Sequence, residues 1–269
     1  MEQMIIAILI IALGFYCFKF YPFEKGNITN LVISAIFIIV TLIAKRIFTL
    51  TIPLFGVESL KIGIEYIPLM LAGFFLSPGY AFVIGLCCDM IGLILVPTGF
   101  PFFGFTLTMI LVCVIPSFVK THIKSFSMRQ TEIMVISLII LLGVGASFYI
   151  WSLDTISIDK TLYHITMIQK MTLITLCLVL TVLFIGFIYL LKKKINEEES
   201  KIFSTWIISV VLVELICTLC LTPLWLDIMY HIPFVVSLCI RVIKECVVLP
   251  LEIFVGYTLI KLLNRVLKV

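Results

Sequence analysis

Long apolar segments recur along the whole chain and constrain its fold more than any other feature. Most segments are about 17 to 25 residues long, the length that an α-helix needs to cross a bilayer. Hydrophobic residues make up 62% of the 269 residues and charged residues only 13%, too little polar surface to cover a soluble globule. Backbone groups in lipid must be paired within the structure, and these segments lack strand alternation, so we predict an all-α, polytopic helical membrane protein.

The apolar segments and the basic residues between them predict a topology. The expected spans are Met4 to Phe18, Leu31 to Leu50, Leu60 to Leu76, Tyr80 to Val96, Phe103 to Val119, Glu132 to Trp151, Lys170 to Leu191, Phe203 to Leu221 and Phe234 to Leu263. Basic residues collect in alternate connections, as they do in cytoplasmic loops. We therefore predict a cell-membrane protein with its N-terminus outside and its C-terminus in the cytoplasm.

One basic pair does not fit this rule. Lys45 and Arg46 fall at the outer end of their predicted helix, where basic residues are disfavoured. Long basic side chains can snorkel to outer headgroups, which is one explanation. The other is an external receptor for an anionic group.

Three predicted loops share the outer face of the central helices. They are Thr51 to Leu60, Pro97 to Gly104 and Thr222 to Pro233, and they combine aromatic side chains with a few charged ones. Aromatic walls with charged anchors suit a flat heterocycle that carries a carboxylate or phosphate. An ordinary interfacial aromatic belt remains the alternative.

Ionisable residues also occur inside the predicted spans. Asp89 lies mid-helix and needs a partner from another helix, whereas Arg241 and Glu245 are one turn apart in the final span and could neutralise each other. Groups at membrane depth are costly and pair inside the bundle or face a wet cavity. They therefore indicate either a structural pair or a functional site.

The order of several short motifs resembles the S components of energy-coupling factor vitamin transporters, in particular the folate-type branch. The motifs are Ala44-Lys45-Arg46-Ile47-Phe48, Ile52-Pro53, Leu60-Lys61-Ile62, Ile67-Pro68-Leu69, Ala72-Gly73, Pro78-Gly79, Gly85, Asp89, Gly92, Pro97-Thr98-Gly99-Phe100 and Gly104-Phe105-Thr106-Leu107, then Leu224-Trp225-Leu226, Tyr230, Pro233-Phe234, Arg241-Val242-Ile243-Lys244 and Pro250-Leu251-Glu252. The resemblance covers about two thirds of the chain by the span of its motifs. The family often has Asn-Thr before Leu-Trp, and this chain has Thr222-Pro223 instead.

The resemblance implies a six-helix S-component-like core with two additions. Residues 1–27 would be an extra N-terminal transmembrane helix, 28–125 core helices 1–4, 126–200 an inserted helical hairpin, and 201–269 core helices 5–6. The resemblance assigns substrate binding to Arg46, Lys61, Phe100, Thr106, Trp225 and Arg241. It implies capture of a folate-like vitamin at the outer face, and delivery with a transmembrane coupling protein and two cytoplasmic ATPase subunits.

Other functions stay open or are disfavoured by the residues. A proton-coupled secondary transporter that uses Asp89 and Arg241, or a structural membrane subunit, is the alternative. An enzyme is not expected, because its acid/base machinery would need clustered side chains and the three histidines fall in predicted loops. The chain lacks a phosphate-binding P-loop sequence, and we expect no cofactor, metal or nucleic-acid partner.

Overall fold

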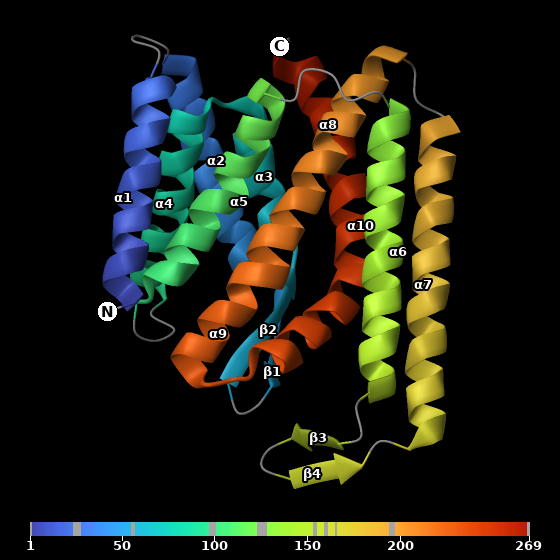
Figure 1. Cartoon of the computed structure of the whole chain (residues 1–269). Helices are drawn as coiled ribbons and strands as arrows, with labels where there is room; N and C mark the ends of the chain where they lie inside the picture. Colours follow the sequence, from blue (N-terminus) through green and yellow to red (C-terminus); the bar gives the residue numbers. More distant parts are fainter. Residues whose placement is uncertain are drawn as a thin grey trace.

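The computed structural model describes residues 2–23, 28–54, 57–96, 101–122, 128–152, 155–158, 161–164, 166–193 and 197–267. Helices dominate this part of the chain (Figure 1), which confirms the predicted helical fold. The elements are α1 (Glu2–Phe20), α2 (Ile28–Ile47), β1 (Thr49–Leu54), β2 (Val57–Gly63), α3 (Tyr66–Phe75), α4 (Pro78–Leu95), α5 (Phe103–His122), α6 (Met128–Ser152), β3 (Thr155–Ile158), β4 (Thr161–His164), α7 (Met167–Lys193), α8 (Glu197–Val213), the π-helix η1 (Glu214–Leu221), α9 (Thr222–Tyr230) and α10 (Phe234–Leu267).

The helices have the length and composition of membrane spans. Within the described residues, seven helical segments are long and apolar enough to cross a bilayer, and their most apolar windows reach a mean hydropathy of 2.5. Many large hydrophobic side chains on α1 and α2 point outward, for example Ile11, which is 70% exposed. Such a surface is expected in a bilayer, because apolar side chains that face lipid are not exposed to water and need no cover by protein. The chain is a multi-pass membrane protein.

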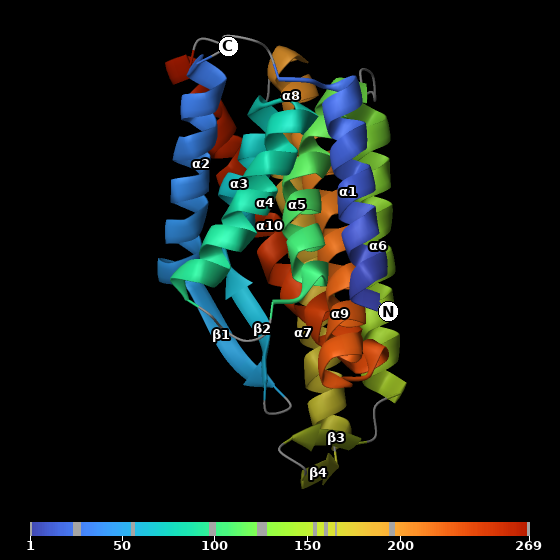
Figure 2. The same cartoon turned by 90° about the vertical axis from the view of Figure 1, so that its left-hand side faces the viewer.

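The long helices run roughly parallel and alternate in direction (Figures 1 and 2). The two β-hairpins, α9 and the N-terminus lie at one end of the bundle, which we call the hairpin end. The C-terminus and the first residues of α2, α6 and α8 lie at the opposite end. The hairpin end therefore gathers the segments that connect α2 to α3, α6 to α7 and α8 to α10.

The sequence prediction of one span from Leu60 to Leu76 is wrong in its first part. Residues Val57–Gly63 form β2, which pairs antiparallel with β1, and α3 starts only at Tyr66. Half of β1 (Thr49, Thr51 and Ile52) is β-branched, and such residues favour extended backbone when a partner strand is adjacent. The resulting hairpin reaches from the end of α2 towards α10, and β2 contacts α10.

The predicted loop Thr222 to Pro233 also forms regular structure. The π-helix η1 ends where Pro223 begins to interrupt the hydrogen bonding, because proline has no N–H and its ring crowds the preceding turn. The backbone N–H and the hydroxyl of Thr222 both donate to the carbonyl of Cys217, the hydroxyl at 2.6 Å. Helix α9 then continues to a left-handed cap at His231, whose φ is 54°.

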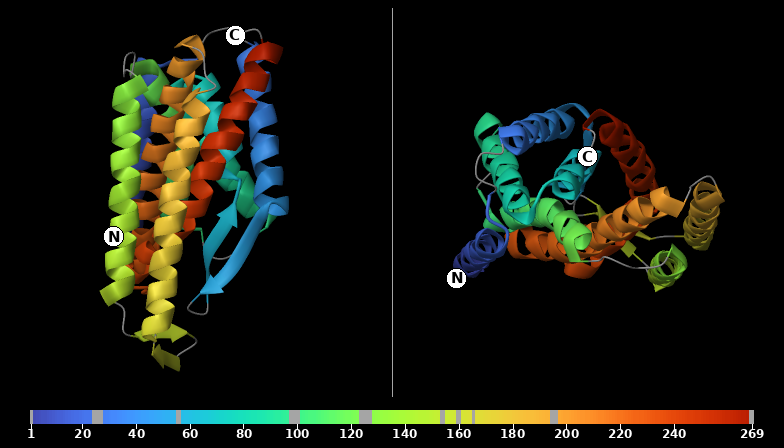
Figure 3. Two further views of the ribbon diagram at one scale, coloured as in Figure 1. Left: turned by 90° about the vertical axis from the view of Figure 1, so that its right-hand side faces the viewer. Right: turned by 90° about the horizontal axis from the view of Figure 1, so that it is seen from above.

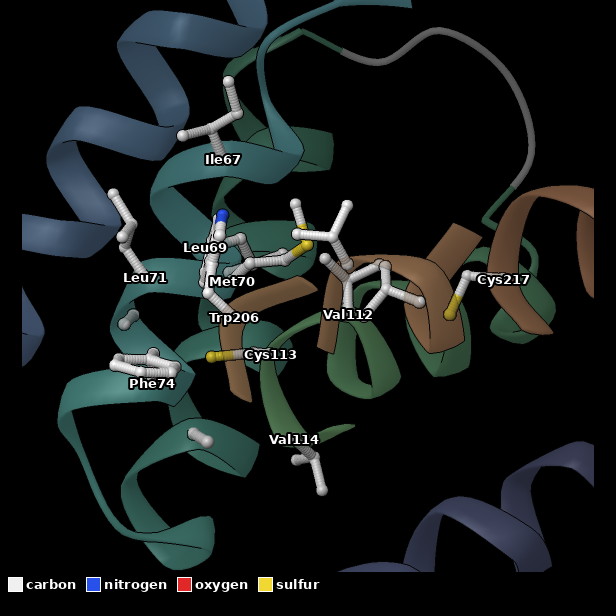
Figure 4. Close-up of a cluster of buried hydrophobic side chains, with 14 of the residues drawn as sticks. Ile67, Leu69, Met70, Leu71, Phe74, Val112, Cys113, Val114, Trp206 and Cys217 are labelled. Atoms are coloured by element: carbon white, nitrogen blue, oxygen red, sulfur yellow. The ribbon is translucent and has the colours of Figure 1, made fainter. Parts of the chain in front are cut away.

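Helix α5 lies at the centre of the bundle, against α3 and α4 on one side and α8 on the other. Gly73 of α3 packs directly on the backbone of Cys113, and Gly85 of α4 packs on the backbone of Ile110. Small residues at such crossings let helices in membranes approach closely. Figure 4 shows the apolar core beside these contacts, where the Trp206 ring lies edge-on to Phe74 at 5.7 Å between centroids.

The segments that the resemblance treats as additions lie outside this core. Helices α6 and α7 pack on each other at one edge of the bundle and contact α8 and α10 (Figure 3). Helix α1 lies on another side and contacts α4 and α5. Helices α3 and α5 therefore stay in direct contact with the C-terminal helices, without α6 or α7 between them.

We predict that Gly85→Ala destabilises the bundle by about 1 to 3 kcal/mol, as overpacking of a close contact does. A Cβ at this position would lie 2.6 Å from the Cα of Ile110, and backbone atoms cannot rotate away. The matched control is Gly145→Ala on α6, where a Cβ meets nothing within 4 Å. Denaturant titration of the detergent-solubilised protein measures both changes, and equal stability of the two variants would contradict the prediction.

Candidate functional site

An aromatic cluster at the hairpin end contains the predicted site residue Trp225. Its ring on α9 lies edge-on to Phe102, with centroids 5.7 Å apart, and its Nε1–H donates to the hydroxyl of Thr108 at 3.0 Å. Gly104 leaves room for the indole, because a Cβ there would lie 2.7 Å from a Trp225 ring atom. Trp225 is only 5% exposed. Its stacking on a ligand ring therefore remains a prediction, and in this structure it joins α9 to α5.

Thr106, a second predicted site residue, provides the partner that Asp89 was expected to need from another helix. The hydroxyl of Thr106 on α5 donates to Oδ2 of Asp89 on α4 at 2.7 Å. Both side chains are buried, at 2% and 4% exposure. A buried carboxyl group at membrane depth is costly without such a donor. The contact thus links α4 to α5 inside the bundle.

Arg46 lies at the hairpin end of α2 and is exposed. One guanidinium nitrogen donates to the backbone carbonyl of Gly92 at 2.9 Å, near the C-terminal end of α4. A cation near a helix C-terminus also interacts favourably with the helix dipole. Arg46 therefore joins α2 to α4, while its remaining N–H groups can serve an anion.

Lys61 and Phe100 are the two remaining predicted site residues in the N-terminal half of the chain. Lys61 lies on β2 opposite Thr51, but its side chain lies outside what the structure describes. Phe100 lies outside the described residues. Their predicted roles in substrate binding stay predictions.

Arg241, the last predicted candidate, belongs to a buried ionic cluster. We use this name for Glu65, Tyr66, Glu214, Arg241, Lys244, Glu245 and Glu252, which come from the start of α3, from η1 and from α10. Arg241 is 5% exposed and lies beside Tyr66 and Glu245. Nζ of Lys244 and Oε1 of Glu245 form an ion pair at 3.2 Å. The basic residues of this cluster are thus adjacent to acidic ones inside the bundle.

Sequence reasoning did not single out Tyr66, Glu214 or Glu252, and the two glutamates matter most here. Glu214 and Glu252 are 2% and 1% exposed, and the electrostatic neighbours of each include the other. Their signal was present, because a glutamate inside an apolar span is costly and marks a functional or paired position. What the sequence could not show is that η1 and α10 bring them together.

The aromatic cluster around Trp225 and the buried ionic cluster are linked through α5 and η1. Thr108 accepts the indole N–H of Trp225, and its backbone carbonyl faces Sγ of Cys217 at 3.9 Å. Cys217 lies one turn from Glu214 on η1. Thr106 on α5 thus bonds α4, and Thr108 on the same helix bonds Trp225 of α9, while Arg241 lies on α10, which contacts η1. Arg46 contacts α4 at Gly92, three residues beyond Asp89.

Comparisons with known proteins give a likeness in structure but not in sequence. No family model matches the chain, and no curated protein sequence matches it. The fold is similar to that in the crystal structure of FolT bound with folic acid, with a TM-score of 0.47 and 17% sequence identity. The likeness covers 84% of this chain and 91% of that chain.

We predict that Thr106→Val destabilises the protein by about 1 to 3 kcal/mol, the cost of leaving a buried polar group without its hydrogen bond. Valine has nearly the shape of threonine but cannot donate to Asp89. Thr106→Ser keeps the hydroxyl and is the control, which we expect to lose less than half as much. Thermal unfolding in detergent compares the two, and a valine variant as stable as the serine variant would contradict a stabilising bond.

Proposed function

We propose that this chain is the membrane-embedded vitamin-capture subunit of an energy-coupling factor transporter. It binds a folate-like heterocyclic vitamin at its outer face and delivers it inward with a transmembrane coupling protein and two cytoplasmic ATPase subunits. It is not an enzyme in this proposal. The proposal starts from the sequence resemblance, which includes residues near both ends of the chain.

One observation supports the proposal most directly. The motif-bearing segments 44–107 and 222–252 are far apart in sequence, yet α5 contacts η1 and α9, while α3 contacts α10. The β1–β2 hairpin contacts the same α10 that carries Arg241 and Glu252. Aromatic and ionisable side chains from both parts of the chain thus lie within one bundle, and a site for a charged heterocycle needs both kinds.

The distribution of basic residues supports the orientation in this proposal. Lys19, Lys120, Lys261 and Arg265 lie on the ends of α1, α5 and α10 away from the hairpin end. Basic residues favour the cytoplasmic side of a membrane protein. The hairpin end then faces outward, where a nutrient would first be met.

A second candidate function is supported by the ionisable residues inside the bundle. Asp89 and the buried ionic cluster are the kind of groups that proton-coupled transporters use. The two functions differ in their energy source. Uptake by this chain alone that a proton ionophore abolishes would favour proton coupling, whereas uptake that requires the ATPase subunits favours the proposed function.

A binding screen of the purified protein against folates, other pterins, pantothenate, flavins and thiamine tests the capture function. We expect Arg46→Ala and Trp225→Ala to weaken binding of the identified vitamin about tenfold or more, because a charged anchor or an aromatic wall is lost. Trp225→Phe keeps an aromatic face and should retain most of the affinity.

The control for the basic anchor is Arg265→Ala, which removes an exposed arginine from the opposite end of the bundle. We expect it to leave the affinity unchanged. If Arg46→Ala and Trp225→Ala bind every ligand found as tightly as the unmodified protein does, the proposed site is wrong.

Labelling of introduced cysteines tests the orientation. A membrane-impermeant maleimide should react with Asp227→Cys, exposed at the hairpin end, in intact cells, and with Arg265→Cys only after permeabilisation. The unmodified protein measures the background from native cysteines. The reverse pattern would place the hairpin end in the cytoplasm and contradict outward capture.

A further inference from the structure

Three carboxyl groups form a hydrogen-bonded row within the buried ionic cluster. Glu214, the first residue of η1, is hydrogen-bonded to Glu252 and to Glu245, which both lie on α10. The side chains of Glu214, Glu252 and Glu245 are 2%, 1% and 3% exposed. An ionised carboxylate only accepts hydrogen bonds, so two ionised carboxylates cannot bond to each other. Each of the two contacts in this row therefore needs a proton.

The charge balance of the cluster leads to the same number of protons. Glu65 brings a fourth carboxyl group, and the basic members among the described residues are Arg241 and Lys244. If all four carboxyl groups were ionised, two negative charges would have no basic partner in the interior of the bundle. Such charges are costly where water is absent. Two bound protons bring the cluster to neutrality.

The described neighbours of the row do not supply the missing positive charge. Its other ionisable neighbours are Tyr66 of α3 and Cys217 of η1, and both types of side chain are ordinarily neutral at neutral pH. Helices α5 and α8 pack on η1, and they have no charged residue between Phe103 and Val119 or between Phe203 and Val213. Among the described residues, histidine, cysteine, aspartate and glutamate side chains form no group of three or more that could hold a metal ion. Protons are the compensation that fits this arrangement.

We propose that Glu214, Glu245 and Glu252 form a proton-binding site that holds two protons at neutral pH and thereby locks η1 to α10. One negative charge then remains in the row, and together with that of Glu65 it balances the two basic groups. The ion pair between Glu245 and Lys244, at 3.2 Å, is part of this balance. The inference goes beyond the proposed function and holds for either energy source, because these protons stay in the folded bundle.

The proton-binding site makes the stability of the folded protein fall as the pH rises. An ordinary glutamate, as in the unfolded chain, has lost its proton by about pH 6, whereas the folded row keeps two protons. The unfolded state then binds fewer protons, so a rise in pH favours unfolding. Two protons released on unfolding raise the unfolding equilibrium constant about a hundredfold per pH unit, and one proton raises it about tenfold.

The double variant Glu214→Gln/Glu252→Gln tests the proposal, because an amide keeps its N–H donors at every pH and carries no charge. The charges of Glu65 and Glu245 then face the two basic groups, which is the balance of the proton-loaded cluster. Denaturant unfolding of the full-length protein in detergent, between about pH 6 and pH 8, measures the equilibrium constant. We expect the constant of the unmodified protein to rise more steeply than that of the double variant, by a further factor of about ten or more per pH unit.

Infrared spectroscopy provides a second readout that does not require unfolding. A protonated carboxyl group has its own C=O stretching band, which shifts in heavy water, and an ionised carboxylate lacks this band. We expect the band in the unmodified protein at neutral pH, and we expect the double variant to lose most of it. Glu252→Gln alone should lose part of the band, so the comparison can still be made if the double variant does not fold.

Glu199→Gln is the control, because it removes a carboxylate that pairs with Lys261 at the end of the bundle away from the hairpins. It should leave both the pH dependence and the infrared band unchanged. The inference is overturned if the unmodified protein and the double variant depend on pH equally, or if the band is absent or survives undiminished in the glutamine variants. Either result leaves the capture function standing, since the binding screen decides it separately.

Discussion

The cost of burying charge inside an apolar bundle governs the arrangement of this protein. Water is absent at membrane depth, so each ionisable group must be met by another group of the protein or by a ligand. Asp89 is met by the hydroxyl of Thr106, and Glu245 by the ammonium group of Lys244. Glu214 and Glu252 keep oxygen atoms without a partner among the described residues.

The packing around this cluster explains how two distant parts of the chain form one unit. Helix α5 approaches α3 and α4 closely at Gly73 and Gly85, and η1 packs on its other side. The wide turn before Pro223 lets α8 continue into α9 without breaking, and it directs Glu214 inward at 2% exposure. Helices α6 and α7 pack at the edge of the bundle. This helical pair therefore does not interrupt the contacts of α5 with α3, α4 and η1.

The sequence predicts the helices and their alternating directions well, because apolar length and basic residues are local signals. It also identifies Asp89 and Arg241 as buried groups that need partners. It misses the strand β2 and the π-helix η1, since both depend on neighbours: β2 on the register with β1, and η1 on the bonds from Thr222 to Cys217. Glu214 and Glu252 could be suspected one by one, but only the packing of η1 on α10 makes them a pair.

The central claim is that this bundle captures a small heterocycle, and its most direct test is native mass spectrometry of the protein purified in detergent from cells that contain vitamins. Tight capture predicts a species heavier than the polypeptide by one small molecule, released on unfolding and absorbing as a heterocycle. Protein that remains empty, also after incubation with the screened vitamins, would contradict the account and favour a structural role in the membrane.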